Sequence, residues 1–394
     1  MKLRRQRQRR IKIRRRTRQV YSVASQRRRK KIRQRKSPRR TRRKPRPITP
    51  KVSITAVPRV PREMCMEASR AGQVQGIEFA MQQEVSTEVP RPIVKNEMQR
   101  RFASFMEPYR PILRHFEWVS AMAESFRDGF VQSRFPQAAD AVLVPTLKRV
   151  DVVLSACNEE RSIGAVLQQL QQLSLNDLFV IINGSKDGTL QVAKEQAQEA
   201  TIVHYTDPLG HDIGRSIGAR LSDADIVLFM DGDFPVPADK LAPFIWAIET
   251  GVDVALNNIT PLLHHFGQQD GITHCKQWLN RCLGREDLYA NSMTAVPHAL
   301  SRHAIETVGE EALCVPPKAQ ALAIVRGLHV QAVQVVDVIH NNRIRQSNVG
   351  ASNPVATLIL GDHMEAFQAL MMERDTVRTD NVERERIARG RNVG

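Results

Sequence analysis

Two aspartates separated by one glycine, Asp231 and Asp233, end an apolar run that reads "DIVLFMDGD". In a strand, residues two apart point to the same side, so the two carboxylates are expected to face one spot. Neighbouring carboxylates repel each other unless a cation lies beside them, and Mg²⁺ or Mn²⁺, held by one or two carboxylates and by substrate phosphates, supplies that cation. Gly232 would let a ligand approach the backbone closely. The spacing predicts a divalent-metal site that could neutralise charge developing on a departing diphosphate.

Two acids in a turn are common, but polar residues also end two earlier apolar runs. In "CNEE", Asn158 and Glu159 could hydrogen-bond a base or a ribose, or they could cap the helix that follows. In "NGSKDGT", Asn183 and Gly184 begin a turn, and Asp187 lies near a helix start, where capping is again an alternative. Both stretches are candidates for binding a polar ligand.

A third stretch, "GHDIGR", combines glycines, a helix start and a cation. Gly210 and Arg215 are its candidate binding residues. The amino end of a helix and an arginine side chain both suit a diphosphate. The alternative for Arg215 is an ordinary exposed charge at a helix start.

From Lys148 onward, short apolar β-branched runs alternate with segments of helical spacing. This alternation predicts a parallel sheet built of βαβ units. In such sheets, ligands bind at the carboxyl ends of the strands. Because each polar stretch follows an apolar run, all of them are expected to meet at that edge.

The ordered set NEE … NGSxDGT … GR … DGD resembles the family 2 glycosyltransferases of the GT-A fold, which use nucleotide-diphosphate sugars. The likeness covers residues 148–345. It implies an α/β fold of GT-A type: a Rossmann-like, mostly parallel sheet flanked by helices. It also implies that Glu159, Asn183 and Asp187 hold the nucleoside. The acids of D-x-D, Asp231 and Asp233, would then hold Mn²⁺ or Mg²⁺ and the diphosphate.

The sequence departs from the family pattern at the end of the second apolar run. Two aspartates usually stand there, the earlier one contacting the base, whereas this chain has Ile182 and Asn183. The nucleotide therefore stays open, with a donor of UDP or GDP type expected and an unknown acceptor.

A second departure concerns the base that would deprotonate the acceptor. Inverting family members carry an acidic pair after the acceptor segment, but here the stretch reads "ALCVPPKAQALAI". Glu286, Asp287 and His298 are candidates to replace it. A loop salt bridge for the acids, a surface position for the histidine, and a retaining mechanism that needs no such base are the alternatives.

The stretch "VVDVIHNNRIRQSN" is expected to end a late strand with His340 and Arg343. In several GT-A enzymes a late histidine completes the ligands of the metal, and nearby basic residues hold the diphosphate. The resemblance thus implies His340 as a third metal ligand and Arg343 as a diphosphate contact. A hydrogen-bonded structural histidine is the alternative.

The net charge of +18 hides two different parts of the chain. Residues 1–50 hold 25 of the 59 Lys and Arg and no acid, which leaves 34 basic against 41 acidic residues elsewhere. Residues 1–60 are expected to be a disordered basic tail with a Pro-rich linker. An Arg-rich segment binds polyanions by releasing counterions, so nucleic acid, a phosphate polymer and an anionic membrane are all compatible partners.

Two flanking segments are expected to be helical. In residues 61–147, a stripe of large apolar residues recurs at helical spacing and indicates a buried face, although such a stripe could also dock a partner. Its members are Phe116, Val119, Met122, Phe126 and Phe130. Residues 346–394 read as a charged, helical extension, interpreted as a solvated terminal helix that frays.

The sequence also limits the compartment. The five cysteines are odd in number and scattered, which argues against a disulfide framework and for a reducing environment. The His and Cys residues between His264 and Cys282 match no standard zinc spacing, so they are interpreted as loop histidines and ordinary thiols. No transmembrane span or secretory signal is expected. A cytoplasmic location is predicted, with peripheral attachment to a membrane or another anionic surface left open.

Two rival functions remain. A nucleotidyltransferase on a similar sheet should carry a Gly-rich loop with a basic residue after the first strand, and "SACNEERSIGA" fits that poorly. A catalytically inactive GT-A-fold binding protein, anchored to a polyanion by its Arg-rich tail, is the alternative of a different class. A metal-dependent glycosyltransferase is the leading hypothesis.

Overall fold

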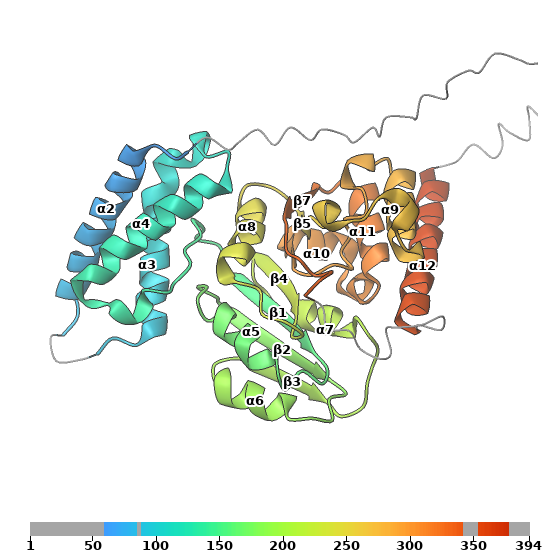
Figure 1. Ribbon diagram of the computed structural model, residues 1–394, viewed down its shortest axis with the longest axis horizontal. Helices are drawn as coiled ribbons and strands as arrows, with labels where there is room; N and C mark the ends of the chain where they lie inside the picture. The colour runs from blue at the N-terminus through green and yellow to red at the C-terminus, as the bar shows by residue number, and fades with distance from the viewer. Residues whose placement is uncertain (1–58, 85–87, 342–353, 378–394) are drawn as a thin grey trace, which may run out of the picture. The chain divides into compact units, whose positions relative to one another are not determined.

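The computed structural model describes residues 59–84, 88–341 and 354–377 (Figure 1). The predictions for residues 1–50 and for Arg343 lie outside these residues. Within the described part, seven strands form one sheet in the order β3-β2-β1-β4-β6-β5-β7. The strands are β1 (Val150–Ala156), β2 (Asp177–Asn183), β3 (Thr201–Tyr205), β4 (Ile226–Asp231), β5 (Val254–Asn257), β6 (His298–Ser301) and β7 (Val330–Gln334).

The first four strands are parallel, because βαβ units connect them. β1 lies between β2 and β4, and β3 pairs with β2, so the carboxyl ends of all four strands share one edge. β6 runs antiparallel to β4 and β5, and β7 is parallel to β5. The predicted α/β fold, with a mostly parallel sheet flanked by helices, is confirmed.

Alternate residues of each buried strand pack on opposite faces of the sheet. On β1, for example, Val152 and Leu154 join one core while Val153 joins the other. Among the helices that follow β1, the first core includes α5 (Ile163–Leu170), α6 (Thr189–Gln196) and α8 (Ala238–Glu249). Those of the second are α7 (Ile213–Leu221), α10 (Arg302–Val308) and α11 (Pro316–Val325). On β4, Val227 and Phe229 belong to the second core, which places Asp231 on the α7 side.

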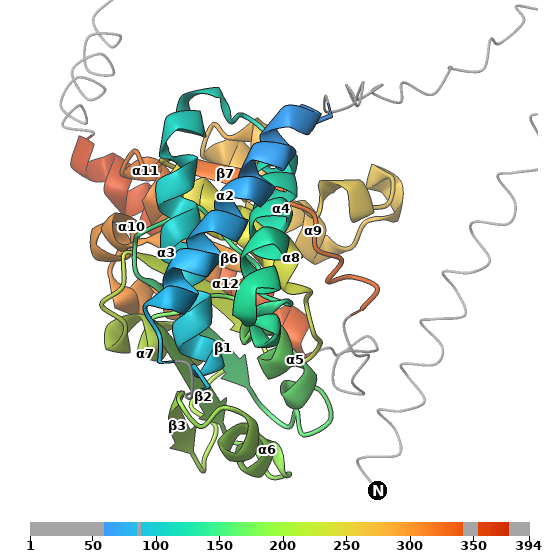
Figure 2. The same ribbon diagram turned by 90° about the vertical axis from the view of Figure 1, so that its left-hand side faces the viewer.

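Three helices precede the sheet: α2 (Arg62–Met81), α3 (Arg91–Met106) and α4 (Phe116–Arg134). Figure 2 shows α2 and α4 side by side. Glycines permit this close approach, since a Cβ on Gly72 would lie 2.0 Å from the carbonyl oxygen of Phe126. The predicted apolar stripe is core: Val119, Met122, Phe126 and Phe130 are fully buried, and Phe116 packs against them.

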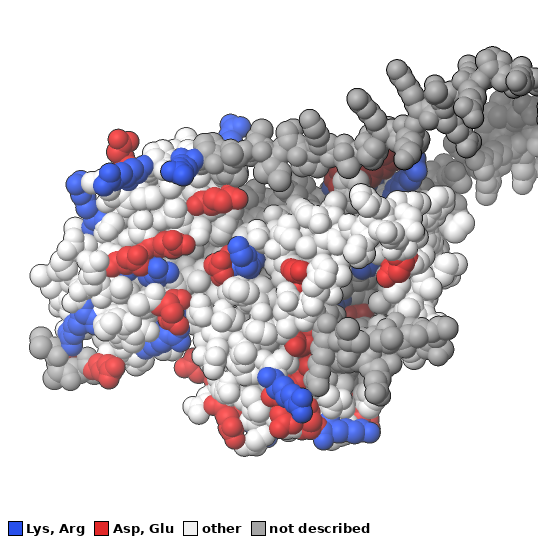
Figure 3. Space-filling view, in the orientation of Figure 1, with Lys and Arg blue, Asp and Glu red and all other residues white. Residues whose placement is uncertain are grey.

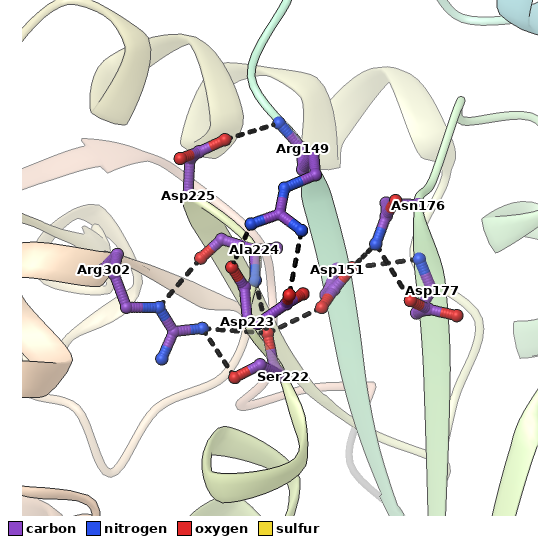
Figure 4. Close-up of polar contacts among 9 residues, drawn as sticks. All are labelled: Arg149, Asp151, Asn176, Asp177, Ser222, Asp223, Ala224, Asp225 and Arg302. Carbon is purple, nitrogen blue, oxygen red and sulfur yellow. Dashed lines mark hydrogen bonds and ion pairs between the residues drawn. The ribbon is translucent and has the colours of Figure 1, made fainter.

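A buried polar network joins the amino ends of three strands (Figure 4). The carboxylate of Asp151, which is fully buried, accepts hydrogen bonds from the Asn176 side chain at 3.1 Å, the Asp177 amide at 2.9 Å and the Ser222 hydroxyl at 2.6 Å. Arg302 donates to the carbonyl oxygen of Ser222 at 2.9 Å. This network lies at the edge opposite to Asp231 and serves the stability of the sheet.

The last described helix, α12 (Pro354–Val377), corrects a prediction. Its buried stripe contains Asp362, His363, Ala366 and Leu370. Ion pairs fix it to α11 and to the turn that follows: Lys318 to Glu365 at 3.7 Å and Arg326 to Glu373 at 2.5 Å. The interpretation as a solvated, fraying helix is wrong for this segment, because α12 packs on α11 and on α9 (Gly271–Cys282).

None of the helices in the described residues is both long and apolar enough to cross a membrane.

Candidate functional site

Asp231 is the last residue of β4 and lies beside the end of β1, where Ser155 is its register partner. Its carboxylate is 3.9 Å from the guanidinium of Arg215, which extends from α7. Burial raises the pKa of Asp231, and the positive charge of Arg215 acts in the opposite direction. The sequence therefore predicted correctly that β4 ends in an acid at the carboxyl edge of the sheet.

Asp233 interacts electrostatically with Asp231, although the predicted strand alternation does not relate the two side chains. The strand ends at Asp231, so the two side chains are not related by strand alternation. They are nevertheless coupled, because burial and then the charge of Asp231 raise the pKa of Asp233 to about 6. Oδ1 of Asp233 is buried and has no hydrogen-bond partner among the described residues.

An acceptor-only oxygen in this position fits a bound cation. A buried carboxylate oxygen without a donor is unfavourable, and a second carboxylate nearby increases the cost. A hard divalent ion with oxygen ligands would remove both penalties. Within the described ranges, no group of three or more His, Cys, Asp or Glu side chains could hold a metal ion.

Some of the buried polar atoms without a partner belong to the strands that flank β4. Seven buried side-chain atoms in the described residues lack a hydrogen-bond partner, and four of them belong to Asp233, Ser155, His298 and Thr294. Ser155 pairs with Asp231 across the strands, and His298 lies on β6, next to β4. Buried polar groups are normally paired, so this concentration indicates a place for a polar ligand.

Gly232 lets the D-G-D turn pack against the end of β1. Its amide donates to the carbonyl oxygen of Ser155 at 2.8 Å, and its own carbonyl oxygen accepts from the Ser162 hydroxyl at 2.7 Å. A Cβ at this position would lie 3.2 Å from that of Ala156. The glycine thus lets the D-G-D turn lie against the end of β1.

Arg215 is a buried cation, not an exposed charge at a helix start. Its Nη1 is 3.1 Å from Asp212 and donates to the carbonyl oxygen of Met293 at 3.2 Å. The side chain therefore links α7, the end of β4 and the loop that contains Met293. An arginine at this place could contact a diphosphate bound at Asp231 and Asp233.

Hydrogen bonds connect the residues that follow β1 to those that follow β2. Asn158 adopts a left-handed backbone, with φ of 58°, and its side-chain oxygen accepts from the Lys186 amide at 2.8 Å. Glu159 is buried and its amide donates to the Thr189 hydroxyl at 2.8 Å. Asp187 accepts from the Thr189 amide at 3.1 Å, which agrees with helix capping. The structure brings these predicted residues together at the carboxyl edge.

The Asn183 side chain forms hydrogen bonds with the loop after β3. Its amide group donates to the carbonyl oxygen of Gly210 at 2.6 Å and accepts from the Leu209 amide at 2.9 Å. Gly184, with φ of 71°, leaves no room for a Cβ beside Pro208. These contacts shape the edge of the site and occupy the Asn183 side chain.

Two of the three candidate bases, Glu286 and Asp287, are paired with arginines at the surface. Asp287 forms two short contacts with Arg285, at 2.8 and 2.7 Å, and Glu286 is 3.2 Å from Arg281, all at the surface. Both acids therefore match the salt-bridge alternative.

The alternative for His298, a surface position, is wrong. His298 is fully buried on β6, and its ring stacks on Phe229 with centroids 5.3 Å apart. Burial, followed by the charge of Arg215, lowers its pKa to about 3, so the ring is a weak base.

His340 is not brought to the two aspartates. Strand β7 ends at Gln334, earlier than expected, and the exposed His340 ring contacts the Asp337 carboxylate at 2.9 Å. The other predicted members of the late stretch lie outside the described residues. All five cysteines are free thiols.

Two charged residues near Arg215 were not found from the sequence. Lys276 lies on α9, where burial lowers its pKa to about 8 and Arg215 acts in the same direction. Asp362 lies on α12, where burial and then Asp212 raise its pKa to about 6. Neither residue belongs to a motif, so only the packing of α9 and α12 on the sheet could have identified them.

Residues 151–284 match the family described as "Glycosyl transferase family 2". The 4,4'-diaponeurosporenoate glycosyltransferase of Staphylococcus haemolyticus (strain JCSC1435) is 31% identical over 93 residues, which make up 22% of this chain and 25% of that protein. The dolichyl-phosphate hexose transferase of Haloferax volcanii is 27% identical over 110 residues, 28% of this chain and 47% of that protein. The chain thus spans between a quarter and about half of the length of these curated relatives.

Among solved structures, glucosyl-3-phosphoglycerate synthase from Mycobacterium tuberculosis, in complex with Mn²⁺, UDP and glucosyl-3-phosphoglycerate, aligns with a TM-score of 0.42 and 18% identity. The alignment covers 58% of this chain and 80% of that one. The predicted resemblance to family 2 glycosyltransferases is confirmed over residues 151–284, which include β4, both aspartates and all of β1 except its first residue.

Proposed function

We propose that this chain is a metal-dependent glycosyltransferase whose donor is a nucleoside-diphosphate sugar of UDP or GDP type. Asp231 and Asp233 would hold Mn²⁺ or Mg²⁺ at the carboxyl edge of the sheet. The observation that carries the proposal is Oδ1 of Asp233, buried beside a second carboxylate and without a partner among the described residues. The match of this segment to family 2 glycosyltransferases supports it.

The chemistry follows from the charges at the site. The divalent ion, when bound, would neutralise the diphosphate as it leaves the sugar. Arg215 is already 3.9 Å from Asp231 and adds a fixed positive charge on the α7 side. The Arg215 side chain would need little rearrangement during the reaction, because Asp212 and the Met293 carbonyl oxygen hold it in place. An acceptor hydroxyl would attack the anomeric carbon, and the nucleoside diphosphate would leave.

The nucleoside would lie over the ends of β1 and β2. Asn158, Glu159 and Asp187 lie at this edge and provide backbone and carboxylate groups for a base or a ribose. The Asn183 side chain shapes this edge through the loop after β3. Glu286, Asp287 and His298 are left out of the proposal, because the acids are paired at the surface and the histidine is buried in the sheet.

The test uses the full chain at an ionic strength high enough to suppress binding to the basic segment. UDP- and GDP-sugars are screened with and without Mn²⁺, by thermal shift and by release of nucleoside diphosphate. Asp231→Asn and Asp233→Asn should abolish the metal-dependent response. Asp239→Asn, an equal change at an exposed aspartate on α8, should leave it intact. If no donor stabilises the wild type and none is hydrolysed, the proposal is wrong and the inactive binding protein becomes the better account.

We also propose that residues 1–50 bind a polyanion or an anionic surface. The support is their composition: the excess positive charge of the chain is in this segment. On the face of the described body drawn in Figure 3, by contrast, acidic and basic side chains are interspersed. Binding to anionic vesicles or to nucleic acid should weaken steeply as salt increases, and deletion of residues 1–50 should abolish it. Binding that is insensitive to salt would contradict the proposal. A cytoplasmic location, peripheral to such a surface, is the corresponding expectation.

A further inference from the structure

A buried amide cluster holds the loop at residues 289–294. Gln320 on α11 accepts from the Met293 amide at 2.8 Å and donates to the side-chain oxygen of Asn280 on α9 at 2.7 Å. Asn280 in turn donates to the carbonyl oxygens of Tyr289 at 2.8 Å and Asn291 at 3.0 Å. Gln320 and Asn280 are 1% and 2% exposed, so the solvent cannot replace these bonds.

The same loop contacts the cation of the candidate site. The amide of Met293 is bound by Gln320, whereas its carbonyl oxygen accepts from Nη1 of Arg215 at 3.2 Å. Nη2 of Arg215 is 3.9 Å from the carboxylate of Asp231. Met293 thus connects Gln320, through its amide, to Arg215, through its carbonyl oxygen.

We infer that Gln320 is a positioning residue for Arg215, acting through Met293, and that it sets the affinity of the site for the diphosphate of the donor. This inference rests on the proposed function. Arg215 also contacts two acids, Asp212 at 3.1 Å and Asp231 at 3.9 Å. The Met293 carbonyl oxygen is the uncharged acceptor among these contacts, so the guanidinium should shift toward the acids when the loop is released.

Packing alone does not explain the choice of a glutamine here. The neighbours of Gln320 along α11 are apolar, and Ala319, Ala321 and Ala323 are buried. An apolar side chain of the same length would fill the space, but it would leave the Met293 amide and the Asn280 oxygen without partners. Buried polar clusters of this kind specify one arrangement of the groups that they hold.

The experiment compares Gln320→Met with Gln99→Met. Gln99 makes the same type of contact elsewhere: it accepts from the Val144 amide at 3.1 Å and donates to the carbonyl oxygens of Val144 and Thr146, away from Arg215. Each change is made in wild type and in Arg215→Met, and the thermal midpoints are measured without ligand. UDP and GDP affinities are measured with Mn²⁺ by calorimetry for wild type, both glutamine variants and Arg215→Met.

The inference predicts that the midpoint loss in Gln320→Met/Arg215→Met is smaller than the sum of the two single losses, and that Gln99→Met adds to Arg215→Met without coupling. Gln320→Met should weaken the better-bound nucleotide roughly ten-fold, the size expected for one misplaced charged hydrogen bond. Gln99→Met should leave that affinity unchanged.

Additive midpoints for Gln320 and Arg215 would overturn the inference. So would a nucleotide affinity that falls in Arg215→Met but stays at the wild-type value in Gln320→Met. If wild type binds neither UDP nor GDP, the proposed function fails, and the ligand-free midpoints still decide whether Gln320 positions Arg215.

Discussion

Replacement of Asp233 by asparagine should make the metal-free protein more stable at neutral pH while it removes the metal-dependent response. Asp233 has a buried, unpartnered oxygen, and burial together with Asp231 raises its pKa from 3.8 to about 6. A raised carboxyl pKa means that the folded protein binds a proton more tightly than the unfolded chain. The free energy of unfolding therefore falls as pH rises from about 3.8 to about 6, and the full penalty is present above that range.

The size of the effect follows from the shift. About 2 pKa units correspond to roughly 3 kcal/mol at 1.36 kcal/mol per unit, which is an upper limit because Asp233 is partly exposed and solvent screens its charge. The asparagine amide remains a buried polar group with an incomplete set of partners, which costs about 1–2 kcal/mol. A net gain of about 1 kcal/mol remains, and for a folded body of this size it should raise the thermal midpoint by roughly 1–2 °C.

The assay is differential scanning calorimetry in EDTA at pH 5 and pH 7.5. Asp233→Asn should have the higher midpoint at pH 7.5, and the difference from wild type should shrink at pH 5, where protonation relieves the wild-type penalty. In samples without EDTA, added Mn²⁺ should raise the thermal midpoint of wild type and leave that of Asp233→Asn unchanged. A variant that is less stable than wild type in EDTA at pH 7.5 would refute the reasoning.

Three further predictions concern the fold. Asp151→Ala leaves three hydrogen-bond donors without their acceptor and should lower the free energy of unfolding by about 3 kcal/mol in urea titrations, whereas an unchanged midpoint would contradict the role given to the network. Gly129→Ala places a Cβ 2.1 Å from the Ser69 carbonyl oxygen, so it should separate α2 from α4 at a cost of about 1–3 kcal/mol, and equal stability of the variant would show that the helices are not in this close contact. Because the pKa of His298 is lowered from 6.5 to about 3 in the folded protein, the unfolded chain binds a proton first as pH falls below 6.5, and the free energy of unfolding decreases. His298→Phe should make the decrease of the free energy of unfolding between pH 6.5 and pH 3 less steep. An unchanged slope would contradict the burial of a neutral His298.

The sheet could be predicted from the sequence because the signals are local. Each of the strands β1 to β4 is a short apolar run, and each connecting helix shows its own spacing between turn residues. Parallel strands joined by helices must place their carboxyl ends on one edge, so the position of Asp231 followed from the order of the elements. The antiparallel β6 and its pairing with β4 had no comparable local signal.

Parts of the site could not be predicted because they depend on contacts between distant segments. Arg215 was identified as a diphosphate candidate, but its burial against Met293 comes from a loop 78 residues later. Gln320 and Asn280 lie 40 residues apart and meet only after α9 and α11 have packed. Asp362 reaches this region because α12 docks, whereas its charge density had suggested a solvated helix.

The candidate bases illustrate the same limit. Glu286 and Asp287 were chosen by chemical type and position along the chain, yet Arg281 and Arg285, their close neighbours, pair with them at the surface. His298 was chosen as a possible base, with a surface histidine as the alternative, but the chain forms β6 there and buries the ring against Phe229. Residue type alone did not indicate which groups face the site.

The central claim is that Asp231 and Asp233 form one metal and diphosphate site. Its most direct test is a titration of the full chain with Mn²⁺, followed by electron paramagnetic resonance, with and without UDP or GDP. The account predicts that wild type binds Mn²⁺ more tightly when the preferred nucleotide is present, that Asp233→Asn loses this binding, and that Asp239→Asn keeps it. Equal Mn²⁺ binding by wild type and Asp233→Asn, in the presence of either nucleotide, would contradict the account.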